Sequence, residues 1–200
     1  MRKLLLLTAL WLGSLNIHSD YSANQPTDLI NINGVSIAYT TAGEEENPSV
    51  LMIMGLMASH KVWGEEIVNE LVNSGYRVIL FDNRDTGESE NLDRLGKPNL
   101  YWKFFMSSLG VDFSSPYTLS DMALDGIGVL DHLGIERAHI VGASMGGMIA
   151  QTIASEFPKR TKSLVSIMST TGAPHLSQMS ERNEQNFNNA GDWDKDAAYS

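Results

Sequence analysis

The stretch Ile140-Val141-Gly142-Ala143-Ser144-Met145-Gly146-Gly147 decides the fold, because it joins a strand to a helix through a glycine turn. The residues before Gly142 form an apolar run that is typical of a buried strand, and those after Ser144 are small and apolar, as in a buried helix. Gly142 and Gly146 flank the serine at the spacing of a nucleophile elbow, a turn too tight for side chains at those two positions. The alternative is a glycine turn that only packs a helix against a strand.

The rest of the chain alternates strand and helix patterns. Asn33-Gly34 between two alternating runs predicts a hairpin. Buried strands are predicted at residues 49–54, 77–81, 137–142 and 162–169, and helices at residues 61–73, 118–134 and 145–155. The helix at 61–73 is expected to bury Val62, Ile67, Leu71 and Val72. This order predicts an α/β protein with a doubly wound, mostly parallel sheet in a three-layer sandwich.

Two further loops follow predicted strands, where ligands bind in such sheets. Met54-Gly55-Leu56 comes after the first buried strand, and Gly55 permits an unusual backbone there. The N–H of Leu56 and the N–H of Met145 are candidate donors to negative charge that develops beside Ser144. The alternative is a simple strand-to-helix turn. Nearby His60 is expected either to line the pocket or to have a capping or surface role.

The next loop carries several charged side chains. Asp82 and Arg84 suit a turn that is held by charge-assisted hydrogen bonds. Gly87 allows a left-handed backbone, and Ser89 can cap the turn. We interpret this loop as structural support for the loop at Gly55 and not as a catalytic group.

Together the three loops resemble those of the α/β-hydrolase superfamily. Arg84-Asp85-Thr86-Gly87-Glu88-Ser89, with Met54-Gly55 in place of the usual His-Gly, looks most like the branch of aclacinomycin methylesterase-like carboxylesterases. The resemblance implies that Ser144 attacks an ester carbonyl and forms an acyl-enzyme, while the N–H groups of Leu56 and Met145 hold the oxyanion. It implies a small, apolar ester substrate and no metal or organic cofactor. The aromatic residues 100–113 would wall the pocket or only cover the sheet edge.

The partners that would activate Ser144 do not follow it in the expected order. The resemblance implies the order serine, acid, histidine. Only His175 follows as a histidine, and the single carboxylate between them, Glu156, is expected at a helix end. His132 and His139 precede the serine, at a helix end and at the start of a strand. We therefore expect a C-terminally truncated hydrolase whose acid, histidine and last strands lie beyond residue 200.

With a signal peptide expected at residues 1–23, this expectation divides the chain into three parts. Residues 24–175 would be the N-terminal part of a hydrolase core, and residues 176–200 the start of a lid. The strand at 162–169 would then be an unprotected apolar edge, which favours aggregation. We expect the isolated chain to be poorly soluble, and a monodisperse monomer that melts cooperatively would contradict this.

The N-terminus has the pattern of a secretory signal peptide, expected at residues 1–23. Arg2 and Lys3 precede an apolar run from Leu4 to Leu12, and small or polar residues follow. The run is too short to span a bilayer. We expect a secreted or periplasmic protein with no membrane anchor after removal of the signal. The alternative is a buried N-terminal helix.

Composition excludes several function classes. The formal net charge is −10 at pH 7, which argues against nucleic acid or an anionic membrane as the main partner. The absence of cysteine excludes a disulfide, a thiolate nucleophile and a cysteine metal site. Three hypotheses follow: an exported carboxylesterase, a catalytically inactive truncated fragment or binding module, and a cofactor-free haloperoxidase or lyase on the same scaffold.

Overall fold

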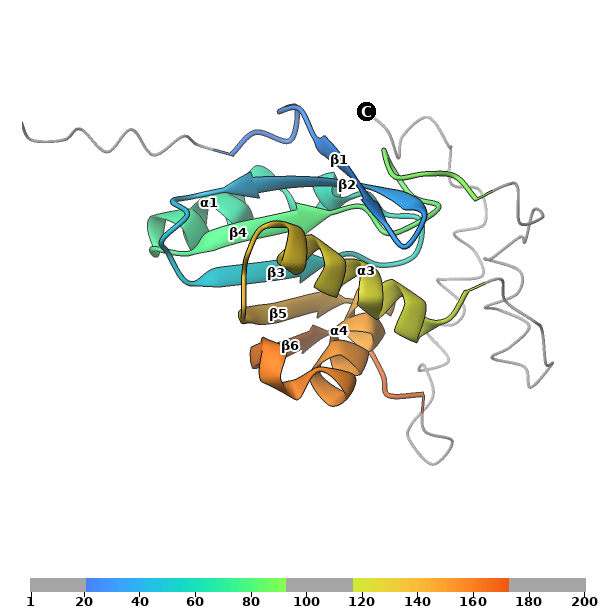
Figure 1. Cartoon of the computed structure of the whole chain (residues 1–200). Helices are drawn as coiled ribbons and strands as arrows, with labels where there is room; N and C mark the ends of the chain where they lie inside the picture. Colours follow the sequence, from blue (N-terminus) through green and yellow to red (C-terminus); the bar gives the residue numbers. More distant parts are fainter. Residues whose placement is uncertain (1–20, 93–116, 173–200) are drawn as a thin grey trace, which may run out of the picture.

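The structure is a computed structural model that describes residues 21–92 and 117–172 (Figure 1). The expectations for residues 1–20, the aromatic residues 100–113, His175 and residues 176–200 lie outside the described residues. The elements are β1 (Asp28–Ile32), β2 (Val35–Ala42), β3 (Ser49–Ile53), η1 (His60–Trp63), α1 (Glu65–Asn73), β4 (Arg77–Phe81), α3 (Leu119–His132), β5 (Ala138–Ala143), α4 (Met145–Glu156), η3 (Pro158–Arg160) and β6 (Thr161–Ile167).

The described strands form one mixed sheet in the order β1-β2-β4-β3-β5-β6. β1 pairs with β2, and β2 with β4, in antiparallel fashion, whereas β4, β3, β5 and β6 run parallel. Figure 1 shows α1 on one face of this sheet and α3 and α4 on the other. The predicted α/β fold, with a mostly parallel sheet between two helical layers, is confirmed.

Each face of the sheet has its own apolar core, because neighbouring side chains of a strand point to opposite faces. Leu51 and Ile53 of β3 belong to the core beneath α3 and α4. Val50 and Met52 of the same strand belong to the core beneath α1. All of β3 and β4 is buried, so the two strands that precede the loops at Gly55 and at Asp82 are packed on both faces.

Local signals gave the hairpin and the start of α3 correctly. Asn33 and Gly34 both have positive φ, 53° and 82°, as a tight hairpin turn between β1 and β2 requires. Asp121 lies three residues after Thr118, which is the spacing of a capping box, and the two residues form one at the N-terminus of α3. Both features depend on residues within one turn of each other, so the sequence reveals them directly.

The predicted helix at residues 61–73 is wrong in its first turn. Gly64 has φ 76° and separates the short helix η1 from α1. The buried positions are Trp63, Val68 and Val72, whereas the expected core residues Val62 and Ile67 are 57% and 51% exposed. Because the glycine interrupts the helical repeat, the spacing between Val62 and the later residues no longer defines one face.

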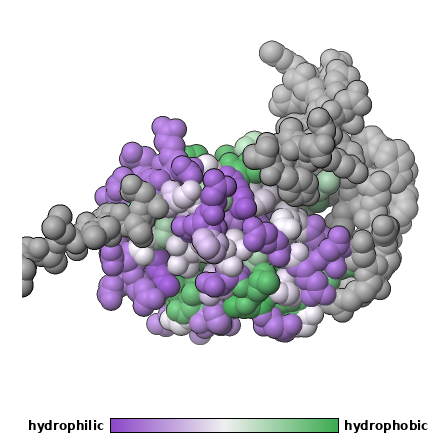
Figure 2. All heavy atoms as spheres, turned by 90° about the horizontal axis from the view of Figure 1, so that it is seen from above, coloured by the Kyte–Doolittle hydropathy of each residue, from purple (hydrophilic) through white to green (hydrophobic). Residues whose placement is uncertain are grey.

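The apolar edge predicted at residues 162–169 is present in the structure. Among the described strands, β6 lies at the end of the sheet and pairs only with β5. Val165 and Met168 are 47% and 80% exposed. Figure 2 shows another face of the molecule, seen from above Figure 1, which is mostly hydrophilic with smaller hydrophobic areas. The poor solubility expected from the edge stays a prediction.

The segment Tyr21-Ser22-Ala23, at the end of the predicted signal peptide, contacts α1. The backbone of Tyr21 is hydrogen-bonded in both directions to the side chain of Asn69, at 2.7 and 3.1 Å. The Tyr21 side chain is 2% exposed in the core beneath α1, and the N–H of Ala23 donates to Glu65. A cut after Ala23 would remove these contacts. No helix in the described part of the chain is long and apolar enough to cross a membrane.

Candidate active site

Two glycines let β5 turn directly into α4. A Cβ on Gly142 would lie 2.1 Å from the carbonyl oxygen of Gly146, and a Cβ on Gly146 would lie 2.1 Å from that of Ile53. Both distances are far below van der Waals contact with rigid backbone. The structure therefore has room only for hydrogen at the two positions that the elbow pattern singled out.

Ser144 occupies the apex of this turn in a strained conformation. Its φ of 55° and ψ of −122° lie outside the regions that residues with side chains usually adopt. Its N–H donates to the carbonyl of Ile167 at the end of β6, at 2.9 Å, and the residue is exposed. Strain of this kind persists where the surroundings enforce it and is common at functional sites.

Ser144 also precedes the first residue of α4. The first N–H groups of a helix have no acceptor within the helix, and they carry the positive end of its dipole. Met145 is the first residue of α4, so its N–H belongs to this set. Within residues 21–92 and 117–172, the Ser144 hydroxyl has no hydrogen-bond partner. The serine is thus presented to solvent beside a group that favours negative charge.

The loop after β3 lies against Ser144. We call residues 54–59 the β3 loop. A Cβ on Gly55 would lie 3.1 Å from Cβ and 3.5 Å from Oγ of Ser144. The next residue, Leu56, is partly buried against the core beneath α4, and Met57 has a left-handed φ of 57°. The structure thus brings Gly55 and Ser144, which are far apart in sequence, into direct contact.

The loop after β4, residues 82–92, is hydrogen-bonded to the β3 loop and to the residue that follows it. We call it the β4 loop. The Nδ2 of Asn83 donates to the carbonyl of Met54 at 2.8 Å. Oδ1 of Asp82 accepts the N–H of His60 at 2.7 Å and lies 2.8 Å from its Nδ1. These contacts agree with the supporting role that the sequence suggested for this loop.

Asp82 is ionised at neutral pH. It is fully buried, and burial alone would raise the pKa of this carboxyl group. Hydrogen bonds from the His60 side chain, the Glu88 N–H and the His60 N–H outweigh that effect, so the pKa lies below its ordinary value of 3.8. A buried carboxylate with these donors is a fixed negative anchor for the β3 loop.

A buried ion pair fixes the β4 loop to α3. Nε and Nη2 of Arg84 donate to the two carboxylate oxygens of Asp125, each at 2.7 Å. The guanidinium also lies over the ring of Tyr117, whose hydroxyl donates to Asp85 at 2.8 Å. Asp85 accepts the N–H of Leu92 as well. The Asp85 carboxylate thus links Leu92 to Tyr117.

The described histidines are not brought to Ser144. His60 is 1% exposed and bound to Asp82, so it has neither the surface role nor a simple capping role. His132 at the end of α3 lies 3.2 Å from the Tyr39 hydroxyl, and His139 of β5 lies 2.7 Å from Ser163. Glu156 ends α4, as predicted, and accepts from Ser120.

The sequence did not reveal the pair of His60 and Asp82. The two residues lie 22 positions apart on different loops. Their pairing depends on β3 and β4 being neighbours with their carboxyl ends side by side. The only signal in the sequence was that both residues follow buried strands.

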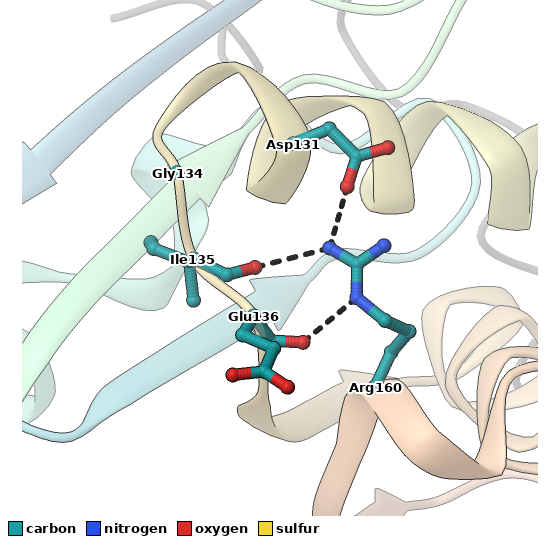
Figure 3. Close-up of a pocket in the computed structure, with 5 residues that line it drawn as sticks. All are labelled: Asp131, Gly134, Ile135, Glu136 and Arg160. Carbon is teal, nitrogen blue, oxygen red and sulfur yellow. Dashed lines mark hydrogen bonds and ion pairs between the residues drawn. The ribbon is translucent and has the colours of Figure 1, made fainter.

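A shallow hollow on the described surface lies at the opposite end of the sheet. Figure 3 shows Arg160 between the end of α3 and the start of β5, among Asp131, Gly134, Ile135 and Glu136. Its guanidinium contacts Asp131 and the carbonyls of Ile135 and Glu136, at 2.6 to 3.0 Å. Ser144 follows the carboxyl end of β5, so this hollow is separate from the candidate site. No group of three or more residues that could hold a metal occurs among the described residues.

Comparisons with known proteins agree with this geometry. A family model described as alpha/beta hydrolase fold matches residues 48–198. Rhodomycin D methylesterase of Streptomyces peucetius is 32% identical over 139 residues, which are 70% of this chain and 41% of that protein. 3-Oxoadipate enol-lactonase 2 of Acinetobacter baylyi is 27% identical over 138 residues, 69% of this chain and 43% of the lactonase.

Solved structures give the same result. The enol-lactonase from Burkholderia xenovorans superposes with a TM-score of 0.53 at 25% identity, over 67% of this chain and 44% of that one. The chain therefore spans less than half the length of the curated relatives that it matches here.

Proposed function

This chain belongs to the α/β-hydrolase fold family, and we propose that it carries the nucleophile of a serine hydrolase that cleaves carboxylic esters through Ser144. The observation that carries the proposal is the strained Ser144 at the start of α4, in contact with Gly55 of the β3 loop. A strand–turn–helix with an exposed serine and a second loop beside it is the arrangement that acyl transfer requires.

The relatives support ester chemistry. The names of the methylesterase and the enol-lactonase both refer to hydrolysis of an ester or lactone bond. The elbow alone is also compatible with the haloperoxidase alternative, because the same scaffold hosts several reactions. We favour the esterase, since these relatives match about 70% of this chain.

In the proposed reaction, Oγ of Ser144 attacks the ester carbonyl and its proton passes to a base. The carbonyl π electrons move to the oxygen, and the N–H groups of Leu56 and Met145 would stabilise the resulting oxyanion. Collapse of the tetrahedral intermediate breaks the bond to the alkoxy group, which leaves as the alcohol after taking up the proton. Water then hydrolyses the acyl-enzyme by the same steps and releases the acid. This chemistry needs no metal or organic cofactor.

The proposal requires a base from outside the described residues. None of His60, His132 and His139 contacts Ser144, and each has another partner. A serine hydroxyl is a weak nucleophile without an adjacent base. The proposed function therefore applies to the whole protein, and the catalytically inactive fragment remains the competing hypothesis for these 200 residues alone.

Hydrolysis of short-chain nitrophenyl esters tests the proposal. We expect Ser144→Ala to lower the rate on the order of 1,000-fold or more, because the nucleophile is lost while the fold is kept. Ser120→Ala is the matched control, since Ser120 is a serine on the surface of α3 that donates to Glu156. Labelling with a fluorophosphonate, followed by peptide mass spectrometry, should place the adduct on Ser144. Equal rates for the wild type and Ser144→Ala, both above the uncatalysed rate, would refute a Ser144 mechanism, whereas no rate above background in the wild type would favour the inactive fragment.

We also propose that the substrate is a small, apolar ester and that the protein is exported. The supporting observation for export is the basic, apolar and small-residue pattern of residues 1–23. Fractionation of cells that express the full chain, followed by determination of the N-terminal residue, tests this. Recovery only in the cytoplasm with residues 1–23 intact would contradict export.

A further inference from the structure

His60 is a buried titratable residue that the proposed reaction does not use. It is 1% exposed, and both its backbone N–H and its ring Nδ1 lie within 2.8 Å of the same oxygen of Asp82. A backbone N–H bond alone would cap the short helix η1. The additional ring contact means that the side chain also sets the position of this segment.

The pair with Asp82 is one of two attachments that bracket the β3 loop. At the start of the loop, Asn83 holds the carbonyl of Met54. Just past its end, Asp82 holds His60. Both attachments come from adjacent residues of the β4 loop. Between them lie residues 55–59, which include the candidate oxyanion donor Leu56.

Asp82 is itself held by several contacts. Its second oxygen accepts the N–H of Glu88 at 2.8 Å, and its carbonyl accepts the hydroxyl of Ser89 at 2.7 Å. Gly87 lies so close that a Cβ there would be 2.1 Å from the carboxylate. Because Asp82 directly follows the buried strand β4, its carboxylate fixes the position of His60 relative to that strand.

The bracketed loop needs such support. Met57 has a left-handed φ, which is uncommon for residues other than glycine and costs energy. The turn within the loop has one long hydrogen bond, from Ala58 N–H to Gly55 carbonyl at 3.4 Å. A loop with weak internal bonds keeps one conformation only if its ends are fixed.

We propose that His60 is a positioning residue: through Asp82 it holds the β3 loop in the one conformation that directs the Leu56 N–H at the reacting carbonyl oxygen beside Ser144. The effect of His60 on catalysis rests on the proposed function. The effect of His60 on the conformation of the β3 loop does not. Donors that are held in place before the reaction stabilise the transition state without a cost of reorganisation.

Hydrogen–deuterium exchange of the full chain tests the inference without turnover. In the wild type, the His60 N–H should exchange as slowly as the backbone of β4. In His60→Leu, exchange in residues 54–60 should rise about tenfold or more, because a hydrogen bond to a charged group is lost. His60→Asn, which can place an N–H near the position of Nδ1, should restore most of the protection. The matched control His132→Leu removes a histidine that is paired with Tyr39 and not with the β4 loop, so it should leave the β3 loop unchanged.

Ester hydrolysis gives the second readout. If the chain hydrolyses nitrophenyl esters, His60→Leu should lower kcat roughly ten- to a hundredfold with little change in KM, because a misplaced donor affects the transition state more than substrate binding. His60→Asn should recover most of kcat. If His60 had a purely structural role, His60→Leu would lower the melting temperature without a selective fall in kcat at unchanged KM.

The two proposals can fail separately. Fast exchange of the His60 N–H in the wild type, or equal loop exchange in His60→Leu and wild type, overturns the positioning role even in an active esterase. The wild-type measurement decides the matter if His60→Leu does not fold. Loop exchange as expected, in a chain whose rate does not depend on Ser144, supports the positioning of the loop while the proposed function fails.

Discussion

Replacement of Gly146 by alanine tests the close packing of the elbow. Gly146 is the second residue of α4, and its φ is not in the left-handed region, so alanine fits the backbone conformation. The added Cβ would lie 2.1 Å from the carbonyl oxygen of Ile53 and 2.6 Å from that of Met54. Both neighbours are backbone of β3 and its loop, which cannot rotate away as a side chain can. The helix must therefore move away from the sheet.

The size of the effect follows from two opposing terms. Overpacking of a close-packed site costs about 1–3 kcal/mol, and contact with rigid backbone puts this site at the upper end of that range. Alanine is favoured over glycine in a helix by about 1 kcal/mol. We therefore expect a net loss of about 2 kcal/mol, or roughly 4–8 °C in Tm for a chain of this length.

Urea unfolding followed by circular dichroism measures the loss. Gly126→Ala is the matched control, because Gly126 is also helical and buried but would place its Cβ 3.2 Å from the end of the Ile153 side chain. That contact can relax, so the control should change stability by less than about 1 kcal/mol. An unfolding midpoint for Gly146→Ala equal to that of the wild type, or a larger loss in Gly126→Ala, would refute the reasoning.

Two further predictions concern buried charge. Asp125→Asn should lower the free energy of unfolding by about 3–5 kcal/mol, because it leaves the Arg84 guanidinium buried without its carboxylate. Removal of the exposed Lys61 ion pair by Lys61→Met should cost less than about 1 kcal/mol in the same urea titration, and equal losses would contradict the distinction. Because the folded pKa of Asp82 lies below 3.8, its contribution is complete above pH 3.8 and is lost as the pH falls through the lower folded value. Thermal melting between pH 5 and 2 should show this loss in the wild type and a smaller one in Asp82→Asn, and parallel curves would contradict it.

The sequence predicted the features that depend on near neighbours in the chain. The glycines around Ser144, the Asn33-Gly34 turn and the capping box at Thr118 each act within a few residues, where sterics and local hydrogen bonds decide the backbone. The apolar runs of β3 and β4 likewise report burial on both faces. Gly64 shows the limit of periodicity. The apolar spacing predicted one helix over residues 61–73, but the positive φ of Gly64 separates its first turn from α1.

Only the tertiary structure decided which distant residues meet. Arg84 and Asp125 lie 41 positions apart, and His60 and Asp82 lie 22 apart, so neither pairing follows from spacing. His60 and Asp82 meet because β3 and β4 are neighbours with their carboxyl ends side by side, and Arg84 meets Asp125 because α3 packs against the sheet beside the β4 loop. The sequence by itself determined that Ser144 stands on a strained turn. The sheet decided that Gly55 contacts this serine and that the β3 loop is attached to Asp82 and Asn83. A charged group or a flexible loop takes a fixed position only when packing places a partner beside it.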